Sequence, residues 1–423
     1  MTKLRAVKGM NDLLPEELGR WRRLESIFRE TAERYGFGEI RTPLLEPTEL
    51  FVRSIGEATD IVEKEMYTFH DKGEKNLTLR PEGTASCARA YLEHTVGARE
   101  AITRWYYLGP MFRRERPTRG RYRQFHQAGV EVYGDPGPFI DAEIIDMLVR
   151  FLSELGIVDL RVLLNSLGDQ ETRQNYREAL IRYLEPHRGS LSADSQRRLE
   201  TNPLRILDSK APEDQAIIEG APSILEHLSE EDQAHFDGVR RTLDRLGTPY
   251  EIEPRLVRGL DYYSRTLFEV QGRGGELGAQ NALAGGGRYD GMIEELGGKA
   301  TPAFGFALGI ERLLLAMGEA EDESRPRVMI LAANDEARVE AVALARELRD
   351  AGFNIETDLR GTSLKSQLRR ADRSGAALAF ILGDDELARG VVQWKRLEGE
   401  GSGESPREGI ASVVAELLGQ KVG

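Results

Sequence analysis

The chain has 423 residues, 40% of them hydrophobic and 30% charged, a composition typical of a soluble globular protein with roughly two to four domains. The first residues, MTKLRAVKGM, carry no apolar signal segment, and no apolar run reaches the roughly 20 residues of a membrane-spanning helix, so we expect no membrane association. Cys87 is the only cysteine, which excludes an intrachain disulfide; we expect no zinc and a cytoplasmic location, while the net charge of -13 still permits a local basic surface.

Apolar residues at steps of three and four predict an amphipathic helix over Pro15 to Tyr35. They are Leu18, Trp21, Leu24, Phe28, Ala32 and Tyr35. A short strand, Glu39 to Thr42, then runs into Pro43, and we interpret it as a buried edge element. After the turn residues 134–138, a second helix is predicted over Asp141 to Leu155.

The composition changes twice further along the chain. Residues 170–247 are charged, rich in helix formers and poor in strand signals, so we predict a helical insertion. The segment EAEDESRPR at 319–327 lacks periodicity, and beyond it strand and helix patterns alternate as in a small α/β domain. We therefore expect a first domain over 1–325 that contains the insertion, and a second over 326–423 in which EGEGSGESPREG forms a flexible loop.

The common nucleotide-binding loops are missing from the sequence. The motif G-x-x-x-x-G-K-[ST] is absent, no G-x-G-x-x-G follows a strand, and the metal-binding motif H-E-x-x-H is also absent. If the protein handles phosphate, it therefore does so with side chains.

A run of arginines connects two segments that we expect to pair as strands, Trp105 to Phe112 and Phe125 to Tyr133. The run contains Arg113, Arg114, Glu115, Arg116, Arg119, Arg121 and Arg123. Guanidinium groups this close repel one another unless an anion is present, and their planar fork matches phosphate. The run predicts either a polyphosphate site or a solvated basic loop.

The second strand favours the polyphosphate site. Residues two apart share a face of a strand, so one face carries Phe125, Gln127, Gly129 and Glu131. The other face is mostly core, with His126 as a packed histidine. We expect Gly129 to leave a gap through which a ligand approaches the backbone. A face with a ring, an amide, a gap and a carboxylate is typical of a pocket.

The text YLGPMFRRERPTRGRYRQFHQAGVEVYG resembles the second signature motif of class II aminoacyl-tRNA synthetases, in the form of the histidyl-tRNA synthetase family. The resemblance implies that Arg113 holds the α-phosphate of ATP and the carboxylate of L-histidine. It also implies that Phe125 stacks on adenine and that Arg121 reaches the γ-phosphate. Gln127 and Glu131 would bind the substrate histidine.

The segment LRPEGTASCARAYLEH places Glu82 and Thr84 just before a helix. Spacing alone favours an N-terminal cap. The resemblance to the same family implies instead a contact with the α-ammonium group of histidine, for which an acidic side chain and a hydroxyl are suitable partners.

The segment RLVRGLDYYSRTLFEV contains Arg258, Tyr262 and Tyr263. An arginine beside two tyrosines is by itself usually a packed cation–π cluster. This string, however, resembles the histidine-specific motif of the family, which implies a catalytic Arg258 that faces the α-phosphate together with Arg113. Both tyrosines would belong to the histidine-binding residues, and Tyr263 would read the imidazole together with Glu131.

Three further segments resemble parts of the same family. ALAGGGRYDGM would form the floor of the histidine pocket, although such a run more often marks a tight turn. AFGFALGIERLLLAM matches the third signature motif, whose arginine, here Arg312, would lie over adenine near the γ-phosphate. EIRTPLLEPTELFVRSIG resembles the first motif, with Pro43 in its strand, which implies the interface of a homodimer.

The resemblance implies an α+β catalytic domain, in which helices flank an antiparallel β-sheet, with a helical insertion and a C-terminal α/β anticodon-binding domain. In that last domain Lys365, Arg369 and Arg373 form a basic stripe along one predicted helix. The stripe is either a solvated face or a contact with the tRNA. The implied partners are tRNA(His), L-histidine and ATP, with Mg²⁺ carried by ATP and no assigned protein ligand for the metal.

Two alternatives remain open from the sequence. The first is a catalytically inactive paralogue, such as the synthetase-like regulatory subunit of ATP phosphoribosyltransferase; such proteins generally lack the final domain and have degraded arginine motifs. The second is another class II synthetase, against which RGLDYYSRT and the pair Gln127 and Glu131 argue.

Overall fold

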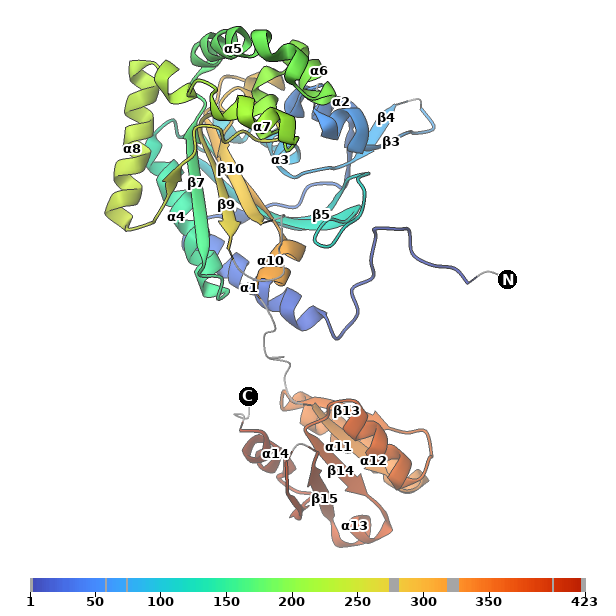
Figure 1. Cartoon of the computed structure of the whole chain (residues 1–423). Coiled ribbons are helices and arrows are strands. Elements are labelled where there is room, and N and C mark those ends of the chain that lie inside the picture. Colours follow the sequence, from blue (N-terminus) through green and yellow to red (C-terminus); the bar gives the residue numbers. More distant parts are fainter. Residues whose placement is uncertain are drawn as a thin grey trace. The chain divides into compact units, whose positions relative to one another are not determined.

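The computed structural model describes residues 3–57, 59–73, 75–273, 281–317, 327–397 and 399–419. Internal contacts divide the chain into two compact units, Met1–Glu321 and Asp322–Gly423 (Figure 1). The predicted boundary segment at 319–327 lies, apart from Arg327, outside the described residues.

An eight-stranded sheet forms the centre of the first unit, in the order β1-β5-β6-β11-β10-β9-β7-β8. The strands are β1 (Gly38–Glu39), β5 (Thr103–Phe112), β6 (Gln124–Tyr133), β7 (Leu160–Ser166), β8 (Glu251–Ile252), β9 (Ser264–Gly272), β10 (Ala282–Arg288) and β11 (Ala303–Gly309). The five central pairings are antiparallel, and only the two outermost, β1 with β5 and β7 with β8, are parallel. The predicted antiparallel sheet is confirmed.

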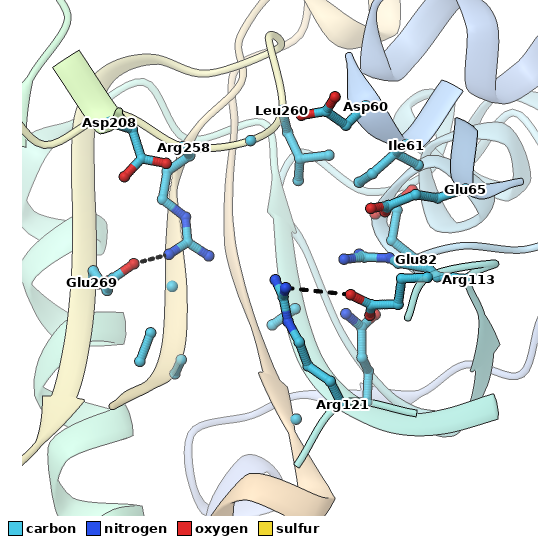
Figure 2. Close-up of a pocket in the computed structure, with 18 of the residues that line it drawn as sticks. Asp60, Ile61, Glu65, Glu82, Arg113, Arg121, Asp208, Arg258, Leu260 and Glu269 are labelled. Atoms are coloured by element: carbon cyan, nitrogen blue, oxygen red, sulfur yellow. Dashed lines mark hydrogen bonds and ion pairs between the residues drawn. The ribbon is translucent and has the colours of Figure 1, made fainter. Parts of the chain in front are cut away.

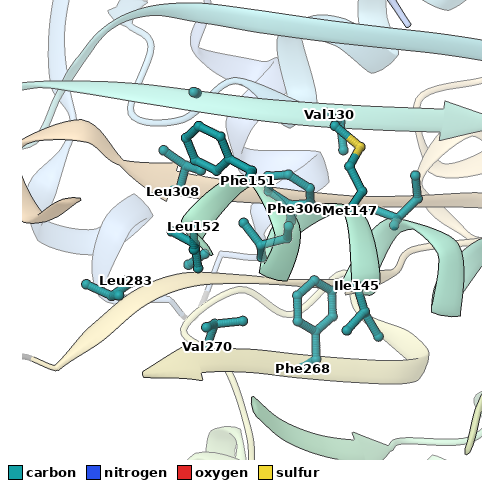
Figure 3. Close-up of a cluster of buried hydrophobic side chains, with 14 of the residues drawn as sticks. Val130, Ile145, Met147, Phe151, Leu152, Phe268, Val270, Leu283, Phe306 and Leu308 are labelled. Atoms are coloured by element: carbon teal, nitrogen blue, oxygen red, sulfur yellow. The ribbon is translucent and has the colours of Figure 1, made fainter. Parts of the chain in front are cut away.

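Helices cover one face of this sheet and bury the main core against it. They are α1 (Leu18–Arg34), α4 (Pro138–Glu154), α8 (Glu230–Leu246) and α10 (Ile310–Ala316). The predicted first helix is confirmed, because Trp21, Leu24 and Phe28 are all buried in that core. Figure 3 shows Phe151 and Leu152 among side chains from the strands, such as Phe306.

The predicted hairpin of β5 and β6 is also confirmed, with direct pairing from Thr103 opposite Tyr133 to Phe112 opposite Gln124. Ala128, Val130 and Val132 of β6 lie in the main core, as the alternation along the strand predicts. The opposite face of β6 is therefore turned away from the core helices.

A smaller sheet, in the order β2-β4-β3, packs beside helices at the edge of the first unit. The elements of this region are β2 (Leu45–Pro47), α2 (Thr48–Ile55), the π-helix η1 (Ile61–Glu65), β3 (Tyr67–His70), β4 (Asn76–Leu79), α3 (Thr84–Glu93), the 3₁₀ helix η2 (Val96–Ala98) and α9 (Met292–Glu295).

The prediction of a buried edge strand from Glu39 to Thr42, running into Pro43, is wrong. Strand β1 ends at Glu39, and Pro43 lies outside any strand with an exposed side chain. Pro43 has no N–H to give to a strand ladder, and the chain here crosses from the large sheet to the small one. Arg80 holds the crossing segment by donating to the carbonyl and hydroxyl oxygens of Thr42.

A helical insertion connects β7 to β8. Its elements are α5 (Gln170–Leu184), η3 (Glu185–Ser190), α6 (Ala193–Thr201), η4 (Pro203–Asp208), α7 (Pro212–Glu219), η5 (Ile224–His227) and α8, where the η elements are 3₁₀ helices. Asp169, Ser192 and Ser229 cap α5, α6 and α8, each accepting from a backbone N–H three residues on. These caps explain why a strongly charged segment starts helices where it does.

The second unit is a five-stranded mixed sheet in the order β13-β12-β14-β15-β16. Its elements are β12 (Arg327–Ala332), α11 (Asp335–Asp350), β13 (Asn354–Asp358), α12 (Leu364–Arg373), β14 (Leu378–Leu382), α13 (Asp384–Arg389), β15 (Val391–Arg396), β16 (Ser402–Pro406) and α14 (Ile410–Leu418). The predicted alternation of strand and helix up to residue 382 is confirmed.

The prediction that EGEGSGESPREG is only a flexible loop is wrong, because Ser402–Pro406 forms β16 and pairs with β15. Gly403 lies under the Trp394 ring, where a Cβ atom would come within 2.6 Å of ring carbon Cζ2. Trp394 also donates to the Ser405 hydroxyl. By composition Gly403 indicates a linker, but here it makes room for the Trp394 ring to pack on strand β16.

Candidate active site

A cleft of about 960 Å³ opens in the first unit between strands β6, β10 and β11 and the insertion. Strand β6 sends Phe125 and Gln127 into this cleft, while Ala128, Val130 and Val132 on its other face are buried in the core. Figure 2 shows the side chains around it: Arg258 and Glu269 lie on one side, and Arg121 and Arg113 on the other.

Six arginines line this cleft: Arg198 and Arg205 of the insertion, and the four predicted from the sequence, Arg113, Arg121, Arg258 and Arg312. Burial lowers the pKa of Arg312, and the neighbouring Arg121 and Arg113 lower it further, against the opposing effect of Glu115. Holding like charges together in this way is unfavourable unless an anion lies between them, and this indicates an anion-binding site. The remaining arginines of the hairpin are not among the described residues that line the cleft.

Arg113 and Arg121, the two cleft arginines of the hairpin, are each held by contacts with neighbouring residues. The Arg113 guanidinium carbon lies 5.2 Å from the centroid of the Phe125 ring, and Arg113 Nε donates to the Pro81 carbonyl oxygen at 2.9 Å. Arg121 forms an ion pair with Glu115 at 3.4 Å. These contacts fix both guanidinium groups before any ligand binds, which reduces the entropy cost of binding.

Arg258 enters the cleft from the irregular segment that precedes β9, and its Nη1 donates to the Glu269 carboxylate of that strand (Figure 2). A Cβ atom on Gly285 would lie 2.3 Å from the guanidinium carbon of Arg258, so only glycine accommodates this side chain. At Gly285, the glycine-rich run therefore makes room for a protein arginine.

Glu131 is fully buried behind the wall of the cleft, where the lining residues Thr84 and Tyr289 donate to its two carboxylate oxygens. Burial raises the pKa of Glu131 to about 8, although these two hydrogen bonds lower it. A Cβ atom on the cleft residue Gly305 would lie 2.2 Å from Glu131 Oε2. With this raised pKa, the free protein holds a mostly protonated carboxyl group directly behind the lining residues of the cleft at neutral pH.

Glu82 both contacts the start of α3 and lines the cleft. Its carboxylate accepts from the backbone N–H groups of Thr84 and Ala85, the first two residues of α3, each at 2.8 Å, although the N-cap residue itself is Gly83. Burial raises the pKa of Glu82, while the two N–H groups lower it. Glu82 and Thr84 also line the cleft.

Gln127, Tyr262 and Tyr263 line the same cleft. Gln127 Oε1 is buried and has no hydrogen-bond partner within the described part of the chain. The two tyrosine rings lie 4.6 Å apart, and burial raises the pKa of each hydroxyl, which keeps both neutral. A buried acceptor without a partner costs about 1–3 kcal/mol, so the Gln127 oxygen indicates a place for a donor from a ligand.

The prediction that Gly129 leaves a gap for a ligand is wrong. Tyr107 lies directly opposite on β5, and a Cβ atom on Gly129 would come within 2.5 Å of its hydroxyl oxygen. Gly83 holds the other side of the same ring, where a Cβ atom would lie 2.3 Å from a ring carbon. A pattern along one strand does not reveal which side chain the paired strand places over it.

The alternation along β6 predicts that His126 points away from the cleft, and the structure agrees. Its ring packs edge-on against Trp21 at 4.9 Å, and its Nδ1 lies 3.0 Å from a carboxylate oxygen of Glu311. It is a packed histidine.

Sequence reasoning missed Tyr289, Glu269 and two arginines of the insertion, Arg198 and Arg205, all of which line the cleft. Tyr289 and Glu269 lie within the quoted segments ALAGGGRYDGM and RTLFEV, so the motifs contained them without singling them out. Arg205 lies in the string TNPLRILDSK, at residues 201–210 of the insertion, and the charged, helical composition of the insertion does not indicate that it reaches the cleft.

In the second unit, the predicted basic stripe lies on α12, and Lys365, Arg369 and Arg373 are all exposed. Among the residues that the structure describes, no group of three or more His, Cys, Asp or Glu could hold a metal ion. None of the described helices is long and apolar enough to span a membrane.

The sheet and its arginine-lined cleft define the catalytic fold of a class II aminoacyl-tRNA synthetase. The family model for histidyl-tRNA synthetase matches residues 9–313, and a model for an anticodon binding domain matches residues 327–417. The chain therefore belongs to the histidyl-tRNA synthetase family.

Relatives support this assignment over nearly the whole chain. A histidine–tRNA ligase of Sorangium cellulosum is 56% identical over 414 residues, which cover 98% of this chain and 96% of that protein, and one of Trichlorobacter lovleyi is 49% identical, with 98% of both covered. The crystal structure of apo S. aureus histidyl-tRNA synthetase matches with a TM-score of 0.82 and 37% identity, covering 97% of this chain and 99% of that one. A Bacillus halodurans protein described as an ATP phosphoribosyltransferase regulatory subunit/histidyl-tRNA synthetase shares the fold, with a TM-score of 0.66 and 24% identity, covering 88% and 97%.

Proposed function

We propose that this chain acts as a histidine–tRNA ligase, which activates L-histidine with ATP in the cleft of its first unit and then transfers it to the 3′ end of tRNA(His). One observation carries the proposal: Arg113, Arg121, Arg258 and Arg312 converge on a cleft, and the buried carboxyl group of Glu131 lies directly behind its lining residues Thr84 and Tyr289. Such a cleft offers cations to a polyphosphate and a hydrogen-bonding group to an imidazole. Membership of the family supports the same activity.

ATP binds through the arginines in this proposal. Arg113 holds the α-phosphate together with the histidine carboxylate, and Arg121 reaches the γ-phosphate. Phe125 stacks on one face of adenine, and Arg312 lies over adenine near the γ-phosphate. Mg²⁺ would enter with ATP as part of the substrate and would neutralise charge on its phosphates.

Histidine binds at the part of the cleft that lies next to Glu131, beside Thr84 and Tyr289. Glu82 and Thr84 contact its α-ammonium group, and Gln127 supplies the buried acceptor that has no partner among the described residues. Tyr263 and Glu131 read the imidazole. Tyr262 packs beside Tyr263, so it belongs to the same pocket.

The reaction then needs positioning and charge stabilisation more than proton transfer. A carboxylate oxygen of histidine attacks the α-phosphorus of ATP, the bond to the bridging oxygen breaks, and pyrophosphate leaves with Mg²⁺. Arg258 and Arg113 stabilise the negative charge that develops at the α-phosphate. In the second step a hydroxyl of the terminal ribose attacks the activated carbonyl, and AMP leaves.

We assign residues 1–325 to the catalytic domain, with the insertion at 170–247, and residues 326–423 to anticodon binding. The match of an anticodon-binding model to residues 327–417 supports the second assignment. We also propose that the segment around Pro43 forms the interface of a homodimer. Leu44 and Leu45 next to it are 43% and 42% exposed, which is consistent with a surface that a partner covers.

ATP–pyrophosphate exchange with each amino acid in turn tests the proposed function. We expect exchange with histidine and none with the other amino acids, because a pocket that pairs its polar groups with an imidazole leaves them unpaired with any other side chain. Folded protein that binds histidine without exchange would instead support the alternative of a regulatory paralogue. Exchange with a different amino acid would overturn the assignment of the pocket.

The basic stripe on α12 gives a separate prediction. Changing Lys365, Arg369 and Arg373 together to alanine is expected to raise the KM for tRNA about tenfold. The slope of the logarithm of the tRNA binding constant against the logarithm of the salt concentration should become shallower by about two. Histidine-dependent exchange without tRNA should be unchanged. Arg346→Ala, an exposed arginine on α11, serves as the matched control; an unchanged salt dependence in the triple variant would show that the stripe is only a solvated face.

A further inference from the structure

The string TNPLRILDSK, at residues 201–210 of the insertion, lies against the segment that carries Arg258 and Tyr263. Its Asn202 donates from Nδ2 to the Asp261 carboxylate oxygen Oδ1 at 2.9 Å. Asp261 belongs to the irregular stretch 253–263, which connects β8 to β9 and has no strand or helix of its own. The insertion therefore makes a direct hydrogen bond to this stretch.

A second residue of the insertion holds the backbone of the same stretch. Arg173 on α5 donates from Nη1 to the carbonyl oxygen of Tyr263 at 2.8 Å and, more weakly, towards that of Asp261 at 3.5 Å. Burial lowers the pKa of Arg173, which nearby carboxylates, including that of Asp261, partly offset. A buried guanidinium group that donates to two carbonyl oxygens of an irregular segment restricts the backbone of that segment.

The opposite side of Asp261 rests on the end of α2. Its N–H donates to the Ile55 carbonyl oxygen at 3.2 Å, and a Cβ atom on Gly56 would lie 3.0 Å from its Oδ2. The Asp261 side chain therefore lies between the insertion on one side and the α2 region on the other. Asp60, five residues beyond α2, in turn forms ion pairs with Arg205 at 3.3 Å and Arg198 at 3.7 Å.

Apolar packing holds part of this stretch, because Leu256, Tyr262 and Tyr263 are buried in a cluster with side chains of the insertion. Asp261 between them has no such packing, and a cavity of about 560 Å³ lies beside it, lined also by Arg173, Asn202 and Tyr263. A polar side chain beside a cavity has fewer packing neighbours, so its placement depends more on its hydrogen bonds. The polar contacts of Asn202 and Arg173 are the specific bonds available on the side of the insertion.

We infer that Asn202 and Arg173 are positioning residues, through which the insertion sets the placement of Arg258 and Tyr263 for histidine activation. The inference rests on the proposed function, because it assumes the roles given there to Arg258 and Tyr263. The string TNPLRILDSK thereby acquires a purpose that does not require contact with substrate.

The test is a side-chain exchange at one hydrogen bond. Asn202→Asp keeps the shape of residue 202 but sets a carboxylate against that of Asp261, and it is expected to lower kcat of histidine-dependent exchange about tenfold or more. The KM for ATP should stay within about twofold, because the arginines of the hairpin and of α10 are not displaced. The double variant Asn202→Asp/Asp261→Asn restores a donor–acceptor pair with its direction reversed, and it should recover kcat to within about threefold of the unmodified protein.

Asn175→Asp is the matched control, since Asn175 is exposed on the same insertion and the stretch 253–263 does not contact it through any described hydrogen bond. Thermal melting of every variant separates loss of fold from loss of position, and recovery in the double variant decides the matter even if Asn202→Asp melts earlier. Unchanged kcat in Asn202→Asp, or no recovery in the double variant, would overturn the inference. Absence of histidine exchange in the unmodified protein would instead refute the proposed function.

Discussion

Arg258→Ala is expected to lower kcat of histidine-dependent ATP–pyrophosphate exchange by about 10³-fold, while histidine binding is weakened but measurable. The guanidinium group lies in the cleft with an ion pair to Glu269 as its fixed anchor, so it is already oriented before substrate binds. Charge that is oriented in advance stabilises the transition state without reorganisation. Rapid-quench exchange and calorimetric titration with histidine measure the two quantities separately.

Two controls make this result specific. Arg258→Lys keeps the charge but loses the planar fork, and we expect a rate between those of the alanine variant and the unmodified protein. Arg245→Ala, exposed on α8, removes an arginine from the same unit away from the cleft and should have no effect. A near-normal rate in Arg258→Ala would refute the catalytic role of Arg258.

Glu131→Ala is expected to raise the KM for histidine by about 10²-fold or more, because it leaves two buried hydroxyl donors, Thr84 and Tyr289, and the substrate imidazole without their acceptor. Steady-state exchange at varied histidine concentration measures this effect. An unchanged histidine requirement would mean that the imidazole binds elsewhere.

The protonation of Glu131 adds a pH dependence to the same prediction. The pKa of Glu131 is raised to about 8 in the free protein, whereas that of a histidine imidazole is about 6.5. At a pH between these two values, Glu131 carries a proton and free histidine has a neutral imidazole. The bound carboxyl–imidazole pair, which shares one proton, therefore forms there without uptake or release of a proton. We expect histidine affinity to be greatest there, to fall above pH 8 as Glu131 loses its proton, and to fall below about pH 6.5 as free histidine gains one.

Glu131→Gln is the control for the upper side of this profile. It cannot lose a proton, so the fall above pH 8 should be smaller than in the unmodified protein. The difference between the two proteins is the relevant quantity, because the α-ammonium group of histidine titrates in both. Identical profiles above pH 8 would show that Glu131 does not exchange a proton with the bound imidazole.

Local patterns in the sequence were enough to predict the elements that build the cleft. The spacing of Trp21, Leu24 and Phe28 predicted α1, and the alternation around Val130 predicted which face of β6 is core. Each of these two predictions concerns a single helix or strand, and hydrophobic periodicity is a good indicator of which face of a single element is buried. The resemblance to the family then connected arginines that are far apart in the sequence.

Features that depend on two elements at once were not predictable in this way. Neither the Tyr107 ring over Gly129 nor the bond from Asn202 to Asp261 follows from any local pattern, because each joins residues that come together only in the folded chain. The run of six arginines is a similar case: only Arg113 and Arg121 of the run reach the cleft, since a connection between strands points side chains in several directions. The short β16 was missed because its glycine-rich composition is also that of a linker.

The Tyr107 ring, held between Gly83 and Gly129, has a consequence for enzyme engineering. Both glycines are needed to make room for this ring, because any side chain added at either position would collide with it. Tyr107 is buried, and its hydroxyl interacts with Thr84 and Glu131, so shortening this side chain creates space next to the proposed histidine pocket and also changes the surroundings of Glu131. A library designed to charge tRNA with ring-substituted histidine analogues should therefore vary Tyr107 and keep both glycines fixed.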